Sequence, residues 1–288
     1  MIVIRLVGGL GNQLHIFAAG YAVAATKKTE LIIDISLIEK GNGVKRKFEL
    51  SHFIYSFRSI IPIHIVDLDG VTNENLISNY KKWRGLTLHS WIDTKENPSI
   101  QMKKIEIDSL LLGHFIDFKW AKVATKFQFP LSLTSIDTNL IDKPEHLNAF
   151  NIHVRLGDYK KHRDLFPELP ENYFISAIEK FHSLNQPIRL FSDDAFYLRL
   201  KYRKLCSLVD DISFRSPKSS LELMKEISSG LTLITSNSTF STWAAWFSQA
   251  KIITTPIPHL IADDWRDGFP ASWVRYDLRS DVWIVRQF

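Results

Sequence analysis

The sequence is poor in the residues that build covalently bridged or metal-clamped scaffolds. Cys206 is the only cysteine among 288 residues, which excludes an intrachain disulfide and any zinc site made from several cysteines. The sequence also lacks a long apolar run. Residues 227–250 carry no charge but are rich in Ser, Thr and Asn, and the apolar residues 2–6 are too few for a secretory signal. We therefore expect a soluble cytoplasmic protein.

Charge of one sign is not concentrated in any long segment. Lys and Arg number 36 against 31 Asp and Glu, a net charge of +5 that fits an anionic ligand, a membrane surface or a nucleic acid. The basic residues form only short clusters, which are typical of solvated faces, so no nucleic-acid partner is expected. The basic-aromatic cluster at 81–84 favours a loose, peripheral association with a membrane.

Alternating strands and helices predict two α/β halves. The first half is expected to contain a strand at 2–6, a glycine loop at 8–12, a helix at 13–26 and strands at 31–34 and 110–115. The second half is expected to contain strands at 150–154, 188–191, 231–235 and 251–254, the last of these being the final strand, and helices at 171–182, 219–228 and 240–250. The polar segment 132–145 predicts a boundary, with domains at 1–147 and 148–288 and a cleft between them.

The glycine loop admits three interpretations. Gly9 and Gly11 begin a dinucleotide-binding pattern, but Leu14 stands where its third glycine belongs. Asp34 ends the next strand near the position of a ribose-binding carboxylate. The loop is otherwise a tight strand-to-helix turn, or a helix terminus whose amides face an anion.

An Asp-x-Asp triplet at 67–69 follows a short apolar run. Such a triplet can hold a divalent metal with a nucleotide diphosphate, but Gly70 favours a simple turn.

The segment after the strand at 150–154 is the most informative. His153 and Arg155 point to the same side because they are two residues apart, and Arg155 can offer a bidentate fork to a phosphate. Gly157 allows a close turn. A core histidine with a structural pair of Arg155 and Asp158 explains the same pattern equally well.

Polar residues also follow the next two strands. Ser192, Asp193 and Asp194 suit either helix capping or the edge of guanine and its ribose. Asn237, Ser238 and Thr239 open a helix, where hydroxyls and free amides can bind phosphate without metal. Three successive strand ends thus converge on a nucleotide diphosphate.

Four segments give the chain a family resemblance. Residues 8–13, 153–159, 191–194 and 237–246 resemble, in order, the motifs of α-1,2-fucosyltransferases of glycosyltransferase family 11. The resemblance implies a GT-B fold of two Rossmann-like domains facing across a cleft, with the acceptor on the N-terminal domain. The last residues of the chain are expected to pack back on that domain. The resemblance also implies a GDP-β-L-fucose donor, inversion to an α-linked fucoside, and no cofactor or metal.

Roles carried over from the resemblance fall into three groups. Arg155, Asp158 and Asn12 are expected to be catalytic. The expected donor-binding residues are Gly9, Gly11, Gln13, His153, Ser192, Asp193, Asp194, Asn237, Ser238, Thr239 and Phe240. The expected acceptor-side residues are His15, His114 and Asp117, which with Asp158 are the candidates for the base.

The chain departs from the family pattern at several positions. Leu156 replaces a second Arg, Thr242 replaces a Trp, the segment 113–117 lacks a Gln, and the segment 224–227 lacks a Cys. These departures leave nucleotide binding intact but bear on the acceptor and on the sugar.

The sequence therefore predicts transfer of fucose to the 2-hydroxyl of a galactose, or a similar sugar, in a lipid-linked surface glycan precursor. The first alternative is a related GDP-sugar transferase, for example a colitosyltransferase. A nicotinamide-dependent oxidoreductase and a non-catalytic glycan- or nucleotide-binding module are further alternatives.

Overall fold

The computed structural model describes residues 1–38, 46–51, 53–54, 60–67, 88–94, 96–133, 147–213, 219–261 and 268–285. The chain divides into two compact units, Met1–Pro130 (unit 1) and Leu131–Phe288 (unit 2). This division falls earlier in the chain than the boundary expected after residue 147. None of the helices in the described ranges combines the length and hydropathy needed to span a bilayer.

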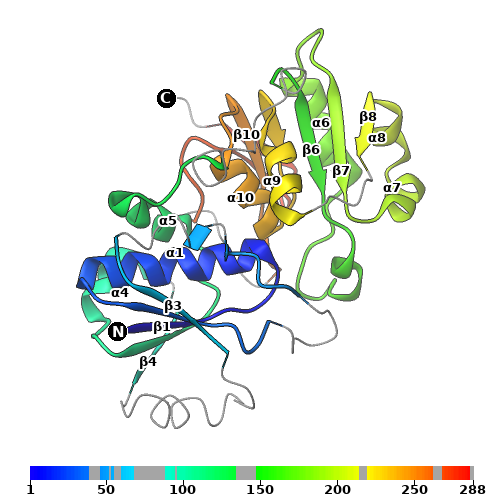
Figure 1. Cartoon of the computed structure of the whole chain (residues 1–288). Coiled ribbons are helices and arrows are strands. Elements are labelled where there is room, and N and C mark those ends of the chain that lie inside the picture. The colour runs from blue at the N-terminus through cyan, green and yellow to red at the C-terminus, as the bar shows by residue number, and fades with distance from the viewer. Residues whose placement is uncertain are drawn as a thin grey trace. The chain divides into compact units, whose positions relative to one another are not determined.

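Unit 1 is a parallel sheet covered by helices (Figure 1). Its strands are β1 (Ile2–Arg5), β2 (Leu31–Asp34), β3 (Ile63–Val66), β4 (His89–Ile92) and β5 (Ser109–Leu112), in the order β3-β2-β1-β5-β4. Its helices are α1 (Leu10–Lys27), α4 (Pro98–Lys104) and α5 (Phe118–Ala124), followed by the 3₁₀ turn η2 (Thr125–Phe127). The expected strand–helix–strand pattern is confirmed, since β1 and β2 pair in parallel across α1.

Helix α1 is apolar on nearly every side because it is packed between the sheet and α5. Its close approach to β1 depends on Gly20. A Cβ atom at Gly20 would lie 2.3 Å from Cγ2 of Ile4, a buried and branched side chain on β1. The lack of a side chain at Gly20 thus allows α1 to lie close to β1.

Unit 2 is a larger sheet in which one edge strand runs antiparallel. Its strands are β6 (Phe150–Val154), β7 (Ile188–Ser192), β8 (Asp211–Ser213), β9 (Thr232–Ile234), β10 (Ile252–Ile257), β11 (Val274–Asp277) and β12 (Val282–Ile284). The order is β12-β11-β10-β9-β6-β7-β8, and only β12 is antiparallel to its neighbour. Its helices are α6 (Glu171–Phe181), α7 (Ala195–Lys201), α8 (Arg203–Ser207), α9 (Ser220–Ser228) and α10 (Thr239–Phe247), with the 3₁₀ turn η5 (Asp158–Lys161).

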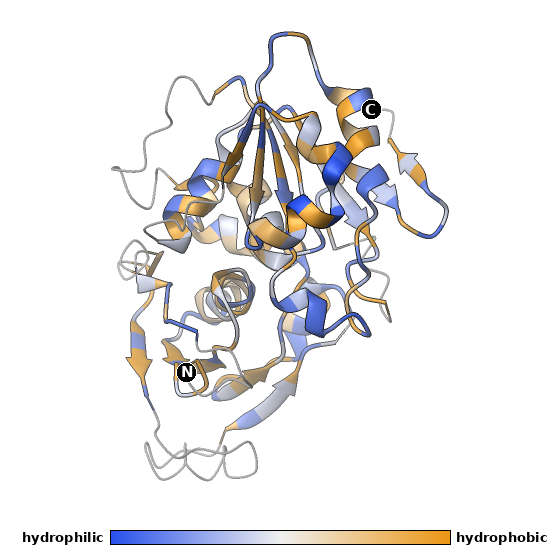
Figure 2. Ribbon diagram, turned by 90° about the vertical axis from the view of Figure 1, so that its right-hand side faces the viewer, coloured by the Kyte–Doolittle hydropathy of each residue, from blue (hydrophilic) through white to orange (hydrophobic). Residues whose placement is uncertain are grey.

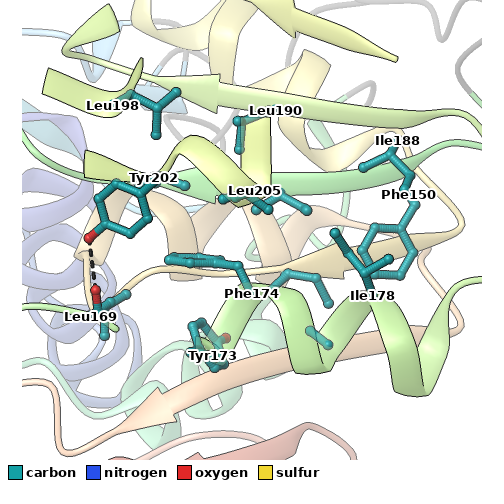
Figure 3. Packing of buried hydrophobic residues seen from close by; sticks show 14 of the residues in the cluster. Phe150, Leu169, Tyr173, Phe174, Ile178, Ile188, Leu190, Leu198, Tyr202 and Leu205 are labelled. Carbon is teal, nitrogen blue, oxygen red and sulfur yellow. Dashed lines mark hydrogen bonds between the residues drawn. The ribbon is translucent and has the colours of Figure 1, made fainter. Parts of the chain in front are cut away.

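Apolar strands and helix faces form the core of unit 2. Figure 2 shows hydrophobic colouring along the central strands of its sheet. Phe150 and Leu190 from the sheet meet Phe174 of α6 and Leu205 of α8 in one buried cluster (Figure 3). Tyr202 joins this cluster and donates its hydroxyl to the carbonyl oxygen of Leu169 at 2.7 Å, so its polar end is satisfied.

The α/β class with two Rossmann-like units is confirmed, but parts of unit 2 differ from expectation. The strand at 251–254 is not the last, because β11 and β12 follow it in the same sheet. Helices α7 and α8 were not predicted, because exposed Phe196 and Leu200 obscure the apolar periodicity of Leu198, Tyr202 and Leu205. That the last residues return to the first domain stays a prediction.

The Gly20 contact gives a test of the α1–β1 packing. Alanine favours an unconstrained helix over glycine by about 1 kcal/mol. Here Gly20→Ala should instead lower the free energy of unfolding by about 1–3 kcal/mol, because the new methyl group overlaps Ile4. Urea unfolding measures the change. Gly9→Ala is the control, since its Cβ would approach Arg46 no closer than 3.8 Å. A stabilising Gly20→Ala substitution would contradict this packing.

Candidate active site

Loops after three neighbouring parallel strands of unit 2 are tied together by hydrogen bonds. Strands β9, β6 and β7 are adjacent, so their carboxyl ends share one edge of the sheet. Arg155 after β6 contacts Asp193 after β7, and Tyr159 donates its hydroxyl to the carbonyl oxygen of Asn237 after β9 at 3.0 Å. The predicted convergence of the three strand ends is confirmed.

Arg155 lies at the centre of this edge between two carboxylates. Its Nη2 is 2.6 Å from Oδ1 of Asp158, and its Nη1 is 2.8 Å from Oδ2 of Asp193. Burial lowers the pKa of Arg155, but the two carboxylates outweigh burial and raise it above the ordinary value. The guanidinium is therefore charged and held in a fixed position, with 21% of its side chain exposed.

Asp193 organises the turn that carries Arg155. Its Oδ1 accepts hydrogen bonds from the amides of Leu156 (2.8 Å) and Gly157 (3.1 Å), while Oδ2 pairs with Arg155. A Cβ atom at Gly157 would lie 2.3 Å from Oδ2, so the turn requires glycine. Both carboxylate oxygens bind protein groups in this structure. That Asp193 binds guanine or ribose stays a prediction.

Asp194 and Ser192 have local structural contacts. Asp194 caps α7 by accepting from the amide of Tyr197 at 2.9 Å, and its other oxygen pairs with Lys160. The hydrogen bond from Lys160 is the main cause of a lowered pKa at Asp194. The Ser192 hydroxyl accepts from the amide of Asp194 at 3.3 Å. Capping and the pair with Lys160 thus account for the contacts of Asp194 in this structure.

His153 lies buried beneath the same edge. Its Nδ1 is 3.2 Å from the hydroxyl oxygen of Ser236, and its ring centroid is 6.0 Å from that of Phe240. Burial lowers the pKa of His153 to about 4, against an opposing effect of Asp193. The imidazole is therefore neutral at pH 7 and supports the edge as a hydrogen-bonding group without adding charge.

The beginning of α10 offers polar groups to the same edge. Ser238 is the N-cap residue, and Tyr159 contacts its side chain. Thr242 donates its hydroxyl to the carbonyl oxygens of Ser238 and Thr239, so it reinforces the first turn. Amides in the first turn of a helix have no acceptor within the helix and carry the positive end of its dipole. The geometry suits an anion.

A small, partly open pocket lies beside Arg155; its space of about 310 Å³ includes open solvent. Cations from Arg155, Lys160 and Arg163 line it. Tyr159 and Phe166 contribute stacked rings with centroids 4.1 Å apart. Three cations and an aromatic wall fit a ligand that is both anionic and cyclic. Sequence reasoning missed Phe166 and Arg163, because both lie in an irregular loop whose contacts arise only from the fold.

The predicted residues of unit 1 surround the glycine loop and the ends of β4 and β5. Gln13 is buried, and its amide group binds the backbone of Gly8, Lys47 and Glu49. It thereby holds the segment after residue 45 against Gly8, next to the N-cap residue Gly9 and the first turn of α1, which contains Gly11 and Asn12. The donor and catalytic roles of these four residues stay predictions.

The acceptor-side candidates have different surroundings. His15 is buried edge-on against Phe118, with ring centroids 4.8 Å apart. Asp117 caps α5 by accepting from the amide of Lys119 at 2.8 Å. His114 is exposed to solvent, although nearby protein atoms still lower its pKa by desolvation. Their role in binding the acceptor stays a prediction.

Asp93, which sequence reasoning missed, lies beside this group. It follows β4 and accepts from the amide of Phe115 at 2.9 Å. Burial raises its pKa to about 6, despite hydrogen bonds that lower it. The strand before it, His89–Ile92, is short and largely exposed, so its apolar signal is weak. A rule that examines every strand end would have found it.

Two expectations about other ligands have different outcomes. Asp34 is fully buried, 3.4 Å from Nε of Arg5, and accepts from the amide of Ser36, so it does not present a carboxylate to a ribose. Of the triplet at 67–69, only Asp67 lies within the described residues. In the part of the chain that the structure describes, no three or more His, Cys, Asp or Glu side chains are grouped to hold a metal ion.

Comparison with known proteins defines the class. A sequence profile of glycosyl transferase family 11 matches residues 130–275, just over half of the chain. The chain belongs to glycosyl transferase family 11. The family resemblance is therefore confirmed, and the oxidoreductase alternative is not supported.

Individual relatives cover nearly the whole chain. An alpha-1,2-colitosyltransferase of Escherichia coli is 27% identical across 96% of this chain and 99% of its own length. The O-antigen biosynthesis glycosyltransferase WbnK of Escherichia coli is 25% identical across 87% of this chain and 92% of its own length. The crystal structure of the fucosyltransferase NodZ from Bradyrhizobium matches with a TM-score of 0.49 and 15% identity, covering 88% of this chain and 94% of NodZ.

The neutral state of His153 can be tested through stability. The unfolded chain protonates His153 near its ordinary pKa of 6.5, whereas the folded chain does so near 4. Stability is therefore lost as pH falls from 6.5 towards 4, with a slope of up to about 1.4 kcal/mol per pH unit. Urea unfolding of the wild type and of His153→Gln should show a shallower pH dependence in the variant. Equal slopes would contradict a neutral, buried His153.

Proposed function

We propose that this enzyme transfers L-fucose from GDP-β-L-fucose to the 2-hydroxyl of a galactose, or a similar sugar, with inversion at the anomeric carbon. The bond from that carbon to the β-phosphate oxygen breaks as the bond to the acceptor oxygen forms. Negative charge therefore develops on GDP in the transition state. Fixed cations and amides directed at that charge lower the barrier.

One observation carries the proposal: a charged, positioned Arg155 shares an edge of the sheet with the first turn of α10. Asp193, and the chain of contacts through Tyr159 to Ser238 and Asn237, link these two groups. Together they offer a guanidinium fork and helix-terminal amides to a diphosphate. A pyrophosphate bound there needs no metal in our account, and no cofactor takes part.

A ligand at this edge must compete with the carboxylates that already bind Arg155. Asp158 is the more readily displaced partner, because Asp193 is also held by two backbone amides. Once it no longer pairs with Arg155, the carboxylate of Asp158 beside the donor is a candidate base for the acceptor proton. Asn12, His15, His114 and Asp117 remain proposed for the fucose and acceptor side.

Colitose is the alternative sugar. The similarity to an alpha-1,2-colitosyltransferase over nearly the full length favours it as a second donor. Colitose lacks one ring hydroxyl of fucose. A site built to hydrogen-bond that hydroxyl discriminates by orders of magnitude, whereas an apolar site does not. The donor can therefore be decided by measuring rates.

The proposed acceptor is a lipid-linked surface glycan precursor, which would place the enzyme in the cytoplasm, peripherally on the inner face of the cytoplasmic membrane. The similarity to an O-antigen biosynthesis glycosyltransferase supports this setting. No nucleic-acid partner is proposed.

Donor and linkage are tested together. The purified chain is incubated separately with GDP-fucose and GDP-colitose in the presence of a panel of β-galactosides, and NMR identifies the linkage of the product. The proposal expects an α-linked sugar on the 2-hydroxyl of galactose, with faster transfer from GDP-fucose. Faster transfer from GDP-colitose would select the alternative. Transfer from neither donor would overturn both.

Removal of the guanidinium tests the donor site itself. A hydrogen bond to a charged group contributes about 1.5–3 kcal/mol, so Arg155→Ala should weaken GDP binding about 10- to 100-fold by calorimetry and abolish transfer. Arg279→Ala removes an exposed guanidinium of the same unit as a control. If the Arg155 variant bound GDP as tightly as the Arg279 variant, the diphosphate site would lie elsewhere.

A further inference from the structure

Two short helices in unit 2 expose large apolar side chains that the core does not use. Helices α7 and α8 lie beyond β7, towards the β8 edge of the sheet (Figure 1). They pack inward through Leu198, Tyr202 and Leu205, each at most 1% exposed. Phe196 is 80% exposed and Leu200 is 52% exposed. Four residues apart on α7, these two lie on the same side of the helix.

Cations surround this apolar pair. Residues 195–209 contain no Asp or Glu but four basic residues, all exposed: Arg199, Lys201, Arg203 and Lys204. One of them, Lys201, pairs with Glu168. On the neighbouring loop, Arg163 donates to the hydroxyl of Tyr197 at 2.7 Å, so the basic segment 160–163 borders α7. The surface combines protruding apolar groups with clustered positive charge.

Exposed apolar residues are common when they are scattered singly. Leu184 is such a case, since it is 92% exposed between the uncharged Ser183 and Asn185. Leu184 precedes β7 and Asp193 follows it, so the two residues lie at opposite ends of that strand. Phe196 and Leu200 differ because they lie on the same side of one helix, and Arg199 and Lys201 flank Leu200. That combination fits a bilayer interface, where rings and aliphatic groups enter the acyl boundary and cations meet anionic head groups.

We propose that α7 and α8 dock this protein onto an anionic lipid bilayer, with Phe196 and Leu200 entering the interface and Arg199, Arg203 and Lys204 facing the head groups. The surface adjoins the proposed donor edge, because α7 begins two residues after Asp193 and Arg163 lines the pocket beside Arg155. Docking there would bring the pocket close to the membrane. The inference rests on the proposed transfer to a lipid-linked acceptor for its purpose, whereas binding itself is independent of catalysis.

Sedimentation with vesicles tests the surface. The full chain is mixed with vesicles of phosphatidylcholine containing about one-third phosphatidylglycerol, or with phosphatidylcholine alone. The wild type should sediment with the anionic vesicles, more weakly as salt rises, and poorly with the neutral ones. The double variant Phe196→Ser with Leu200→Ser should bind at least about tenfold more weakly, because two apolar side chains no longer leave water. Arg203→Glu with Lys204→Glu should weaken binding to anionic vesicles specifically.

Leu184→Ser is the matched control, and it should bind vesicles like the wild type. Transfer to a soluble β-galactoside should be unchanged in the Phe196 and Leu200 variant, which separates a failure of docking from a failure of the proposed function. Absence of wild-type binding to anionic vesicles would overturn the inference, as would equal losses in the Leu184 control and the double variant. A shift of RNA or DNA mobility without vesicle binding would assign the cations to a nucleic acid and would also overturn it.

Discussion

The pairing of Arg155 with Asp193 is the interaction on which the rest of the site depends. It joins the loops after β6 and β7, and the same carboxylate fixes the backbone of the turn that carries the arginine. A guanidinium on a flexible loop would lose conformational entropy on binding a phosphate, whereas one already held between two carboxylates has lost much of it. Gly157 and the neutral His153 serve the same edge, one by leaving room for the carboxylate and the other by filling space without charge.

The Arg155 site and its pocket adjoin the exposed helices α7 and α8. Asp193 positions Arg155, Asp194 caps α7, and α7 carries the apolar pair that we assign to a bilayer. Asp193 and Asp194 thus link the proposed donor site to the exposed surface of α7. If the proposed function and docking surface are correct, a water-soluble donor and a membrane-held acceptor would meet at one edge of this sheet.

The sequence predicted most of the regular framework because several of its strands are short apolar runs beside polar residues, as at residues 31–34 and 109–112. It also predicted that three strand ends converge, since parallel neighbours must share an edge. It did not predict which side chains bind one another. Three contacts result from packing between distant segments. Asp193 binds the amides of a turn, Gln13 binds backbone groups, and Asp34 is buried against Arg5. Asp93 and Phe166 were not predicted because their surroundings come from loops without periodicity.

The central claim is that the diphosphate of a GDP-sugar is bound at the carboxyl edge of the unit 2 sheet. A crystal structure of the protein with GDP tests it most directly. The account predicts the β-phosphate within hydrogen-bond reach of the Arg155 guanidinium and of amides in the first turn of α10, with Asp193 still holding the Gly157 turn. Density for GDP at the glycine loop of unit 1, with Arg155 still paired to both carboxylates, would contradict it.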